Sequence, residues 1–258
     1  ELPVDSSLDS IGNSAFDGCT SLESIEFPDP LQSIGDYAFD GCTNLASVEL
    51  PAFLNSIGDG AFIGCTSLES LEFPASLNSI GYSAFYGCTS LASIEFPADS
   101  SLEYLGEDVF SGCTSLESIE FPDPLQSIGD YAFDGCTNLA SVELPAFLNS
   151  IGDGAFIGCT SLESLEFPAS LNSIGYSAFY GCTSLASIEF PADSSLEYIG
   201  EGAFDGCTSL ASIKFPASLE TILDGAYLYT TSNGTVRYGA HTYIIALLLV
   251  WTSLYTLG

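Results

Sequence analysis

The sequence predicts an α/β solenoid, in which a short strand and a short helical turn recur once in every coil of the chain. Three observations indicate this fold. The 9 cysteines recur at spacings of 23, 23, 23 and 25 residues, and that cycle then repeats. A larger unit of 94 residues starts at Gly18 and returns almost unchanged from Gly112. Phenylalanine recurs with the same period. A fixed period of about 20 to 30 residues is typical of solenoids.

One coil, residues 18–40, shows where each element should lie. Residues 24–27 alternate polar and apolar side chains, which predicts a half-buried strand. Pro28 should end that strand, because proline has no N–H to donate to a ladder. Residues 34–39 are apolar at i, i+4 and i+5, which favours a short helical turn, and Gly41 follows where a left-handed cap is expected. We therefore expect strands on one side of the solenoid and helical turns on the convex side.

Coils of this length need neighbours to bury their apolar side chains, so equivalent residues should stack in columns. The clearest predicted column is made of phenylalanine, at positions 16, 39, 62, 85, 110, 133, 156, 179 and 204.

The recurring phrase SIGxxAFxGCTSLxSIxFP resembles the BspA-like, or Treponema-type, leucine-rich repeat of bacterial and protist surface proteins. Ile-Gly, Ala-Phe, Gly-Cys-Thr and the proline after the strand all recur in phase over residues 1–216. The resemblance implies a right-handed leucine-rich-repeat coil with a parallel β-sheet on its concave face. It also implies a secreted or cell-surface protein that is not an enzyme and that is often used for adhesion.

The charge of the chain excludes several classes of function. With 34 acidic and 2 basic residues, the formal net charge is −32, which repels nucleic acid and anionic membranes. The basic side chains and the one imidazole of the chain are Lys214, Arg237 and His241. No phosphate loop, GxSxG elbow or HExxH pair is present. Paired carboxylates are the remaining catalytic chemistry, yet equivalent carboxylates recur in every coil and none is singled out. We expect no enzyme activity.

The cysteines should form a buried column of nine free thiols. Stacked in register, neighbouring Cβ atoms would lie about 4.8 Å apart, beyond the roughly 3.5–4.5 Å that a disulfide prefers. No CxxC spacing or accompanying histidine indicates a metal site.

The exposed side of each strand should carry one column of serine and one of glutamate. Carboxylates about 5 Å apart repel by about 0.8 kcal/mol per pair in water. Two interpretations stay open: a solvated acidic face, or a surface that binds a divalent cation or a basic ligand. We expect no cofactor, and Ca²⁺ is the alternative, although no EF-hand or GGxGxD motif is present. The candidate ligand face is Glu26, Glu49, Glu72, Glu95, Glu120, Glu143, Glu166 and Glu189, and Lys214 ends the column.

Threonine also recurs once per coil, directly after each cysteine. Hydroxyls that stabilise turns explain this column most simply. An ice-binding lattice is the alternative interpretation.

The two ends depart from the repeat. Residues 1–3 align with 26–28, so the chain starts in mid-repeat, as a processed or truncated chain would. We assign residues 1–216 to a solenoid of about nine repeats and residues 217–258 to a β-rich C-terminal cap or assembly segment. Residues 227–238 predict a hairpin around Asn233-Gly234, and Asn233 also starts a glycosylation sequon.

The C-terminal run from Tyr243 to Trp251 is apolar but too short for a membrane span, which needs about 20 residues. It could cap the last repeat, form part of a lipid-anchor signal, or dock onto a second subunit. For docking, Glu1 of one subunit would stack on Lys214 of the next. The candidate self-assembly residues are Glu1, Leu2, Lys214, Ile244, Ile245, Leu247, Leu248, Leu249 and Trp251.

The sequence thus predicts an extracellular structural or adhesive scaffold that assembles head to tail into a filament. The alternative is a monomeric surface adhesin for a host or matrix ligand. The expected partner is accordingly the chain itself, or an extracellular protein or glycan. Cation binding and ice binding are lesser alternatives.

Overall fold

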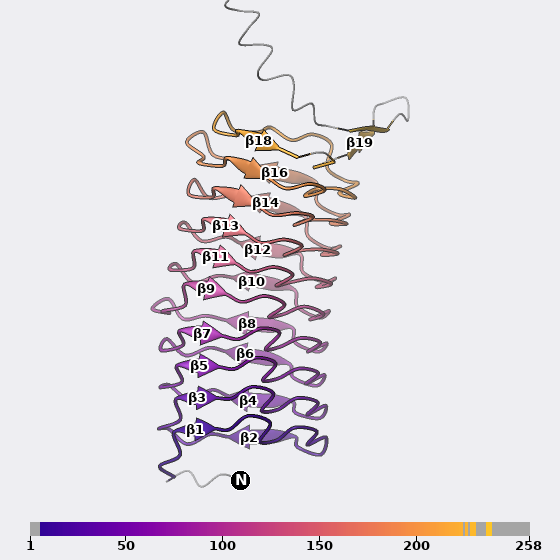
Figure 1. The fold of residues 1–258 in the computed structure, drawn as a ribbon. Helices are drawn as coiled ribbons and strands as arrows, with labels where there is room; N and C mark the ends of the chain where they lie inside the picture. The colour runs from indigo at the N-terminus through magenta and orange to yellow at the C-terminus, as the bar shows by residue number, and fades with distance from the viewer. Residues whose placement is uncertain (1–5, 224, 227, 231–235, 239–258) are drawn as a thin grey trace, which may run out of the picture.

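A computed structural model of the chain describes residues 6–223, 225–226, 228–230 and 236–238. The chain winds into flat coils that stack into one nearly straight column, with the first coil at one end and the last at the other (Figure 1). Each coil is one repeat of 23 or 25 residues and contributes two short strands, except that residues 211–216 of the last repeat form none.

The strands form two rows on the column. One row has three-residue strands with the sequence Ser-x-Glu: β2 (Ser24–Glu26), β4 (Ser47–Glu49), β6 (Ser70–Glu72), β8 (Ser93–Glu95), β10 (Ser118–Glu120), β12 (Ser141–Glu143), β14 (Ser164–Glu166) and β16 (Ser187–Glu189). The other row has two-residue strands: β1 (Ser10–Ile11), β3 (Ser33–Ile34), β5 (Ser56–Ile57), β7 (Ser79–Ile80), β9 (Tyr104–Leu105), β11 (Ser127–Ile128), β13 (Ser150–Ile151), β15 (Ser173–Ile174), β17 (Tyr198–Ile199) and β18 (Thr221–Ile222).

Strands of successive coils pair in parallel and in register. Ser24 faces Ser47, Ile25 faces Val48 and Glu26 faces Glu49, and the same correspondence recurs along the chain. The column of like residues that the period predicts is therefore confirmed. The parallel strands lie in two rows around the coil, whereas the resemblance implied a single sheet on a concave face.

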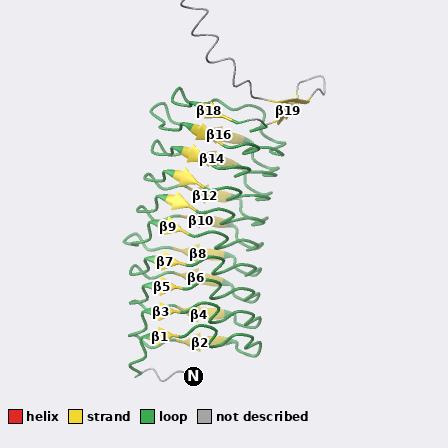
Figure 2. Ribbon diagram, in the orientation of Figure 1, coloured by secondary structure: helices red, strands yellow, loops and turns green. Residues whose placement is uncertain are grey.

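The predicted helical turns are wrong, since no helix is present in the described residues (Figure 2). The backbone N–H groups of residues 34–42 explain why. Those of Tyr37, Phe39 and Gly41 donate to carbonyls of the next coil at 2.7–2.8 Å, whereas those of Asp40 and Cys42 close i→i−3 turns. Every second N–H group thus bonds to the neighbouring coil. In an α-helix, each N–H would instead bond to the carbonyl four residues earlier in the same segment.

Positive φ angles make this alternation possible. Tyr37 has φ 55° and Gly41 has φ 66°, so the chain reverses its twist twice within one turn. Six non-glycine residues in the described chain adopt such a conformation, all at the position of Tyr37 in the repeat. The turn is therefore held by inter-coil hydrogen bonds against a local conformational cost.

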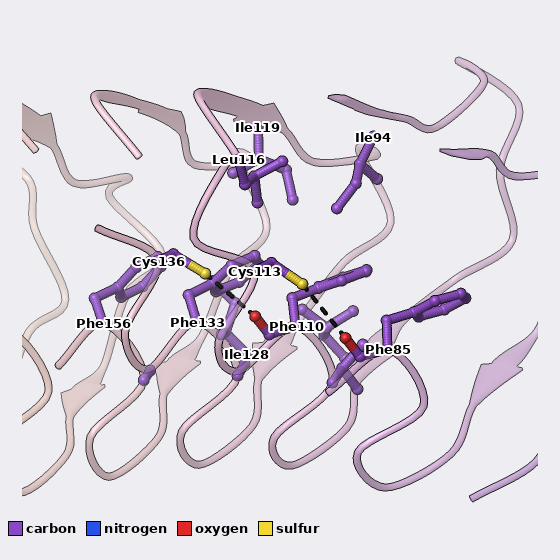
Figure 3. Close-up of a cluster of buried hydrophobic side chains, with 14 of the residues drawn as sticks. Phe85, Ile94, Phe110, Cys113, Leu116, Ile119, Ile128, Phe133, Cys136 and Phe156 are labelled. Atoms are coloured by element: carbon purple, nitrogen blue, oxygen red, sulfur yellow. Dashed lines mark hydrogen bonds between the residues drawn. The ribbon is translucent and has the colours of Figure 1, made fainter. Parts of the chain in front are cut away.

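The core is a stack of aromatic rings flanked by aliphatic side chains. Phe39 and Phe62 lie 5.0 Å apart between ring centroids at an interplanar angle of 7°, and the stack continues from Phe16 to Phe204. Phe16 is half-buried in the first coil, and the other eight rings of the column are buried. Figure 3 shows Phe85, Phe110 and their neighbours within this core.

At the C-terminal end the stack continues past residue 216, because β18 pairs in parallel with β17. Beyond it, β19 (Leu228–Thr230) and β20 (Val236–Tyr238) pair antiparallel, with Tyr229 facing Arg237. The antiparallel pairing agrees with the two strands of the predicted hairpin, whose turn at residues 231–235 lies outside the described residues.

Candidate binding surfaces

The eight Ser-x-Glu strands place their serines and glutamates on the outer face of the column. In each strand the central residue is buried and its two neighbours are exposed. The eight glutamates of the predicted ligand face thus lie in one line, which we call the Ser/Glu face. Lys214 is exposed at the end of this line, but residues 211–216 form no strand.

The strands of the Ser/Glu face are grouped in twos. β2 pairs with β4, β6 with β8, β10 with β12 and β14 with β16, and no ladder joins one pair to the next. Just before the strands, the N–H of Ala92 donates to Glu69 O within a pair at 2.9 Å. Between pairs, Glu117 N–H donates to Ala92 O at 3.4 Å. The residue directly before each of these eight strands alternates between Glu and Ala along the chain. The grouping of the strands in twos therefore follows this alternation in sequence.

Open seams lie between the strand pairs. The seam between β8 and β10 holds a hollow of about 340 Å³, lined in part by Glu95 and Glu120. The seam between β12 and β14 holds one of about 490 Å³, lined in part by Glu143 and Glu166. Each of these hollows is therefore flanked by two carboxylates from neighbouring coils.

A third hollow, of about 460 Å³, follows β16. Glu189 and Lys214 both line it, so the last position of this face carries the opposite charge from the rest. The Ser/Glu face is acidic from β2 to β16 and changes sign at its C-terminal end.

A second group of carboxylates supports the fold. In the turns, Asp36 Oδ1 accepts the backbone N–H of Asp59 at 3.0 Å, and Asp59 Oδ1 accepts that of Tyr82 at 2.8 Å. The second half of the chain repeats this ladder through Asp130 and Asp153. Part of the acidic composition is therefore structural, because each carboxylate caps the next coil.

Three other turn carboxyls carry an electrostatic cost. Burial raises the pKa of Asp40, and the nearby Asp17 carboxylate adds to the effect. Burial also raises the pKa of Asp134, with Asp108 as the neighbouring charge. For Asp108 burial again dominates, Tyr82 opposes it by hydrogen bonding, and Asp130 raises the pKa further. These groups take up protons more readily in the folded chain than in the unfolded chain.

The cysteines form the predicted column of free thiols, but one of them is exposed. Cys42 through Cys207 are buried, whereas Cys19 in the first coil is exposed. Each buried thiol donates to a phenylalanine carbonyl, such as Cys113 Sγ to Phe85 O at 3.4 Å (Figure 3). Burial raises the pKa of Cys88 and of Cys136 to about 12. Since the thiolate is the reactive form, the buried column is chemically inert.

The threonine column is engaged with the backbone. Thr66 Oγ1 donates to Thr43 O at 3.3 Å, and Thr160 Oγ1 donates to Thr137 O at 3.1 Å. Five of the nine hydroxyls of the column donate in this way, the other three being those of Thr114, Thr183 and Thr208. These bonds favour the turn-stabilising interpretation over an ice-binding lattice.

Several predicted residues lie outside the described part of the chain. They are Glu1, Leu2, Asn233, Ile244, Ile245, Leu247, Leu248, Leu249 and Trp251. Their roles in assembly or glycosylation stay predictions.

Within the described residues, no group of three or more His, Cys, Asp or Glu side chains is placed to hold a metal ion. No helix in that part of the chain is long and apolar enough to cross a bilayer.

The sequence interpretation missed Phe53 and Phe147, which are the most exposed large apolar side chains in the described structure, at 64% and 65%. Each directly precedes a leucine of the core, Leu54 or Leu148. Two consecutive apolar residues suggest that both are buried, so the sequence does not indicate that the phenylalanine is exposed. The signal that distinguishes them is that the other repeats carry proline or serine at this position.

Comparisons with known proteins agree with the architecture. A Treponema pallidum leucine-rich repeat protein is 30% identical, with 78% of this chain and 83% of that chain covered and a TM-score of 0.59. A leucine-rich repeat protein from Bacteroides ovatus is 29% identical, with 81% of this chain and 71% of that chain covered and a TM-score of 0.50. The pneumococcal vaccine antigen PcpA shares the fold at 21% identity, with 85% and 70% covered and a TM-score of 0.52.

No curated protein matches the chain. The family model for the BspA type leucine rich repeat region matches residues 1–117 and 103–234, with 6 copies of the repeat. The chain therefore belongs to the BspA-type leucine-rich repeat family.

Proposed function

We propose that the protein is a non-enzymatic scaffold of the cell surface or the extracellular space, and that it adheres through its Ser/Glu face to a basic protein partner. Membership of the BspA-type family supports the scaffold role. The observation that carries the adhesive role is the line of exposed glutamates, interrupted by seams flanked by carboxylates.

The chemistry of this face favours arginine and lysine as the groups bound. Its glutamates only accept hydrogen bonds when ionised, and a guanidinium donates to carboxylates in a fixed fork. Glu143 and Glu166 flank one hollow, so a side chain entering the seam would meet a carboxylate from each neighbouring coil. The net charge of −32 adds long-range attraction for a basic surface.

A divalent cation is a weaker candidate for the same face. Ca²⁺ takes six to eight oxygen ligands, whereas the described residues contain no cluster of three or more ligating side chains. The face therefore suits spread positive charge better than a point cation.

The test uses poly-L-arginine as the probe and compares two variants with equal net charge. The seam variant carries E95Q, E120Q, E143Q and E166Q. The control variant carries D99N, E103Q, D193N and E197Q, four exposed carboxylates in loops away from the Ser/Glu face. We expect the seam variant to lose about tenfold in affinity or more at low salt, since exposed pairs contribute about 0.2–1 kcal/mol each. Equal losses in the two variants would contradict a defined binding face.

Head-to-tail assembly is a second candidate. β1 and β18 are the end strands of the described two-residue row, and each pairs on one side only, as β7 and β9 also do inside the column. The outer sides of β1 and β18 are therefore edges that another chain could extend. Sedimentation velocity at increasing concentration should then reveal species of growing length. A single monomeric species at 100 μM or more would remove this candidate.

A further inference from the structure

The loops between the two strand rows contain an exception to the burial pattern. Of the 18 phenylalanines, Phe53 and Phe147 are exposed, and the other 16 are buried or half-buried. The two lie at equivalent positions of the 94-residue unit. Leaving a phenylalanine ring in water forgoes about 1.5–3 kcal/mol of burial. The exposure of Phe53 and Phe147 therefore forgoes stabilisation that the chain gains from its other phenylalanine rings.

The loop that carries Phe53 is held in place from both sides. Leu54 is fully buried, and its N–H donates to Pro51 O at 3.0 Å. In the next coil, Ser76 Oγ lies 2.9 Å from Ala52 O and 2.7 Å from Leu54 O, so its hydroxyl donates to the carbonyls on either side of Phe53. The ring therefore projects from a fixed turn.

The second copy is built in the same way. The N–H of Leu148 donates to Pro145 O at 3.1 Å. Ser170 Oγ lies 2.9 Å from Ala146 O and 2.6 Å from Leu148 O. The arrangement around an exposed ring is thus reproduced four coils along the column.

Polar side chains complete the site beside Phe53. A hollow of about 380 Å³ is lined by Asp29, Pro30, Gln32, Phe53 and Asn55. Asn55 N–H donates to Gln32 O at 2.8 Å, so the two amide residues lie in register in adjacent coils, and both are exposed. The amides provide hydrogen-bond donors and acceptors, and the carboxylate provides acceptors. The same five residue types recur as Asp123, Pro124, Gln126, Phe147 and Asn149.

We propose that Phe53 and Phe147 are the centres of two equivalent binding sites for a neutral polysaccharide. The flat apolar ring fits the C–H face of a sugar, and the amides and the carboxylate fit its hydroxyl groups. The charge of −32 excludes anionic glycans as the preferred ligand. A protein partner fits less well, because a stable protein interface needs about 800 Å² per partner and each site offers one ring among small polar groups.

The repetition of the site defines the ligand further. The two rings are separated by four coils, or about 19 Å at the spacing of parallel strands. A polymer that reaches both sites gains avidity of about 10²–10⁴ over one that reaches a single site. The ligand is therefore a chain of several sugars, and a disaccharide should bind weakly. These sites lie off the Ser/Glu face, so the proposal is independent of the basic partner.

Affinity electrophoresis in native gels tests this proposal on the full chain. The gels contain, one at a time, hydroxyethyl cellulose, soluble starch, xylan, β-1,3-glucan or mannan. The site variant is F53A/F147A, and the matched control is Y86A/Y180A, which removes another pair of exposed rings 94 residues apart. We expect at least one polymer to retard the unmodified chain and the control, and to leave the site variant unretarded. Either single variant should lose about 100-fold in affinity for that polymer.

Thermal unfolding of the site variant separates binding from folding, because an exposed ring should leave the midpoint unchanged. No retardation by any of the five polymers would overturn the proposal. So would equal retardation of the site variant and the unmodified chain, or a capture of basic peptides that depends on Phe53 and Phe147. Loss of poly-L-arginine binding through the seam substitutions would leave polysaccharide binding intact.

Discussion

The two halves of the column share one sequence but differ in how their coils meet. Residues 18–104 and 112–198 are identical. In the second half, β15 pairs with β17, and Gly200 N–H donates to Ile174 O at 2.9 Å. At the equivalent place in the first half, β7 and β9 form no ladder, and Gly106 N–H has no backbone acceptor in the described structure.

The two halves differ in sequence just after the shared stretch. Leu105, Asp108 and Val109 of the first half correspond to Ile199, Gly202 and Ala203 of the second. Val109 is fully buried and larger than alanine, and Asp108 adopts φ 54° where the second half has glycine. A Cβ placed on Gly200 would lie 2.5 Å from Gly175 C, whereas one on Gly106 would meet Ile80 O first at 3.0 Å.

The phenylalanine rings at this junction are also stacked farther apart and less parallel than those in the second half. Phe110 lies 5.5 Å from Phe85 at 14° and 5.6 Å from Phe133 at 24°, whereas Phe156 lies 5.2 Å from both of its neighbours at 3–6°. The comparison teaches that the spacing of coils is set locally. At the junction between β7 and β9, the larger buried Val109 coincides with the loss of a ladder. A non-glycine residue at positive φ does not suffice, because Tyr131 and Ser177 adopt it in coils whose two-residue strands pair on both sides.

The largest expected effect is the loss of a stacked ring. Phe156→Ala should destabilise the fold by about 3–5 kcal/mol, because it leaves a cavity in a tightly packed column. Phe110→Ala should cost less, because its neighbours already lie farther from parallel stacking. Urea unfolding of both variants measures the difference. Equal losses would show that the looser geometry has no energetic counterpart.

Exchanging the junction residues should move the loose junction. Gly202→Asp with Ala203→Val should destabilise the second half by about 1–3 kcal/mol, through overpacking and a non-glycine residue at positive φ. Hydrogen exchange should then accelerate at the Gly200 amide. The reverse pair, Asp108→Gly with Val109→Ala, should slow exchange at Gly106. Unchanged exchange at both amides would place the cause outside these two positions.

The response to pH should be similar in both halves. Asp40 and Asp134 occupy equivalent positions, and burial raises the pKa of both carboxyls. The folded chain therefore binds their protons more tightly than the unfolded chain does. The stability gained from this protonation is fully present below the unfolded pKa, near 3.8, and is lost as pH rises through the folded values.

Removing either charge should accordingly stabilise the protein at neutral pH. Asp134→Asn should raise the thermal midpoint at pH 7, and Asp40→Asn should do the same. The gain should shrink as the pH approaches 4, because the unmodified carboxyl is then protonated. A midpoint that falls at pH 7 would show that the carboxylate makes a favourable contact in the folded state.

The smallest effect concerns two thiols with the same local sequence. Cys19 is exposed, whereas Cys113 is fully buried and burial holds its pKa well above the usual value. Ellman's reagent should modify Cys19 quickly and leave the other eight thiols until the chain unfolds. Cys19→Ser should leave the folded protein without rapid reaction and change its stability by less than about 0.5 kcal/mol. Rapid modification of several thiols would contradict the buried column.

Much of the fold follows from the sequence because a strict period places like residues in columns. The pairing of Glu26 with Glu49 and the stacking of Phe39 on Phe62 both come directly from the period. The helical turn was predicted wrongly because an apolar pattern at i, i+4 and i+5 suits two structures. It fits a helix, and it fits a turn whose alternate N–H groups bond to the next coil. Hydrogen bonds between coils cannot be read from the apolar sequence pattern of a single repeat.

The candidate sites were less predictable for a related reason. The alternation of Glu23 and Ala46 is visible in the sequence, but its link to strand pairs and open seams depends on distances between coils. The exposure of Phe53 depends on the path of a loop whose next residue, Leu54, is fully buried.

Distances between spin labels on the Ser/Glu face test the stacking of coils most directly. In a Cys19→Ser background, one label at Ser24 is combined with a second at Ser141, Ser164 or Ser187. These serines lie five, six and seven coils farther along, so the three distances should be about 24, 29 and 34 Å, growing with each coil by about the spacing of parallel strands. The step from Ser141 to Ser164 crosses the seam between β12 and β14, so it should be no smaller than the step from Ser164 to Ser187 within a pair. Distances that fail to grow from coil to coil would contradict the in-register column.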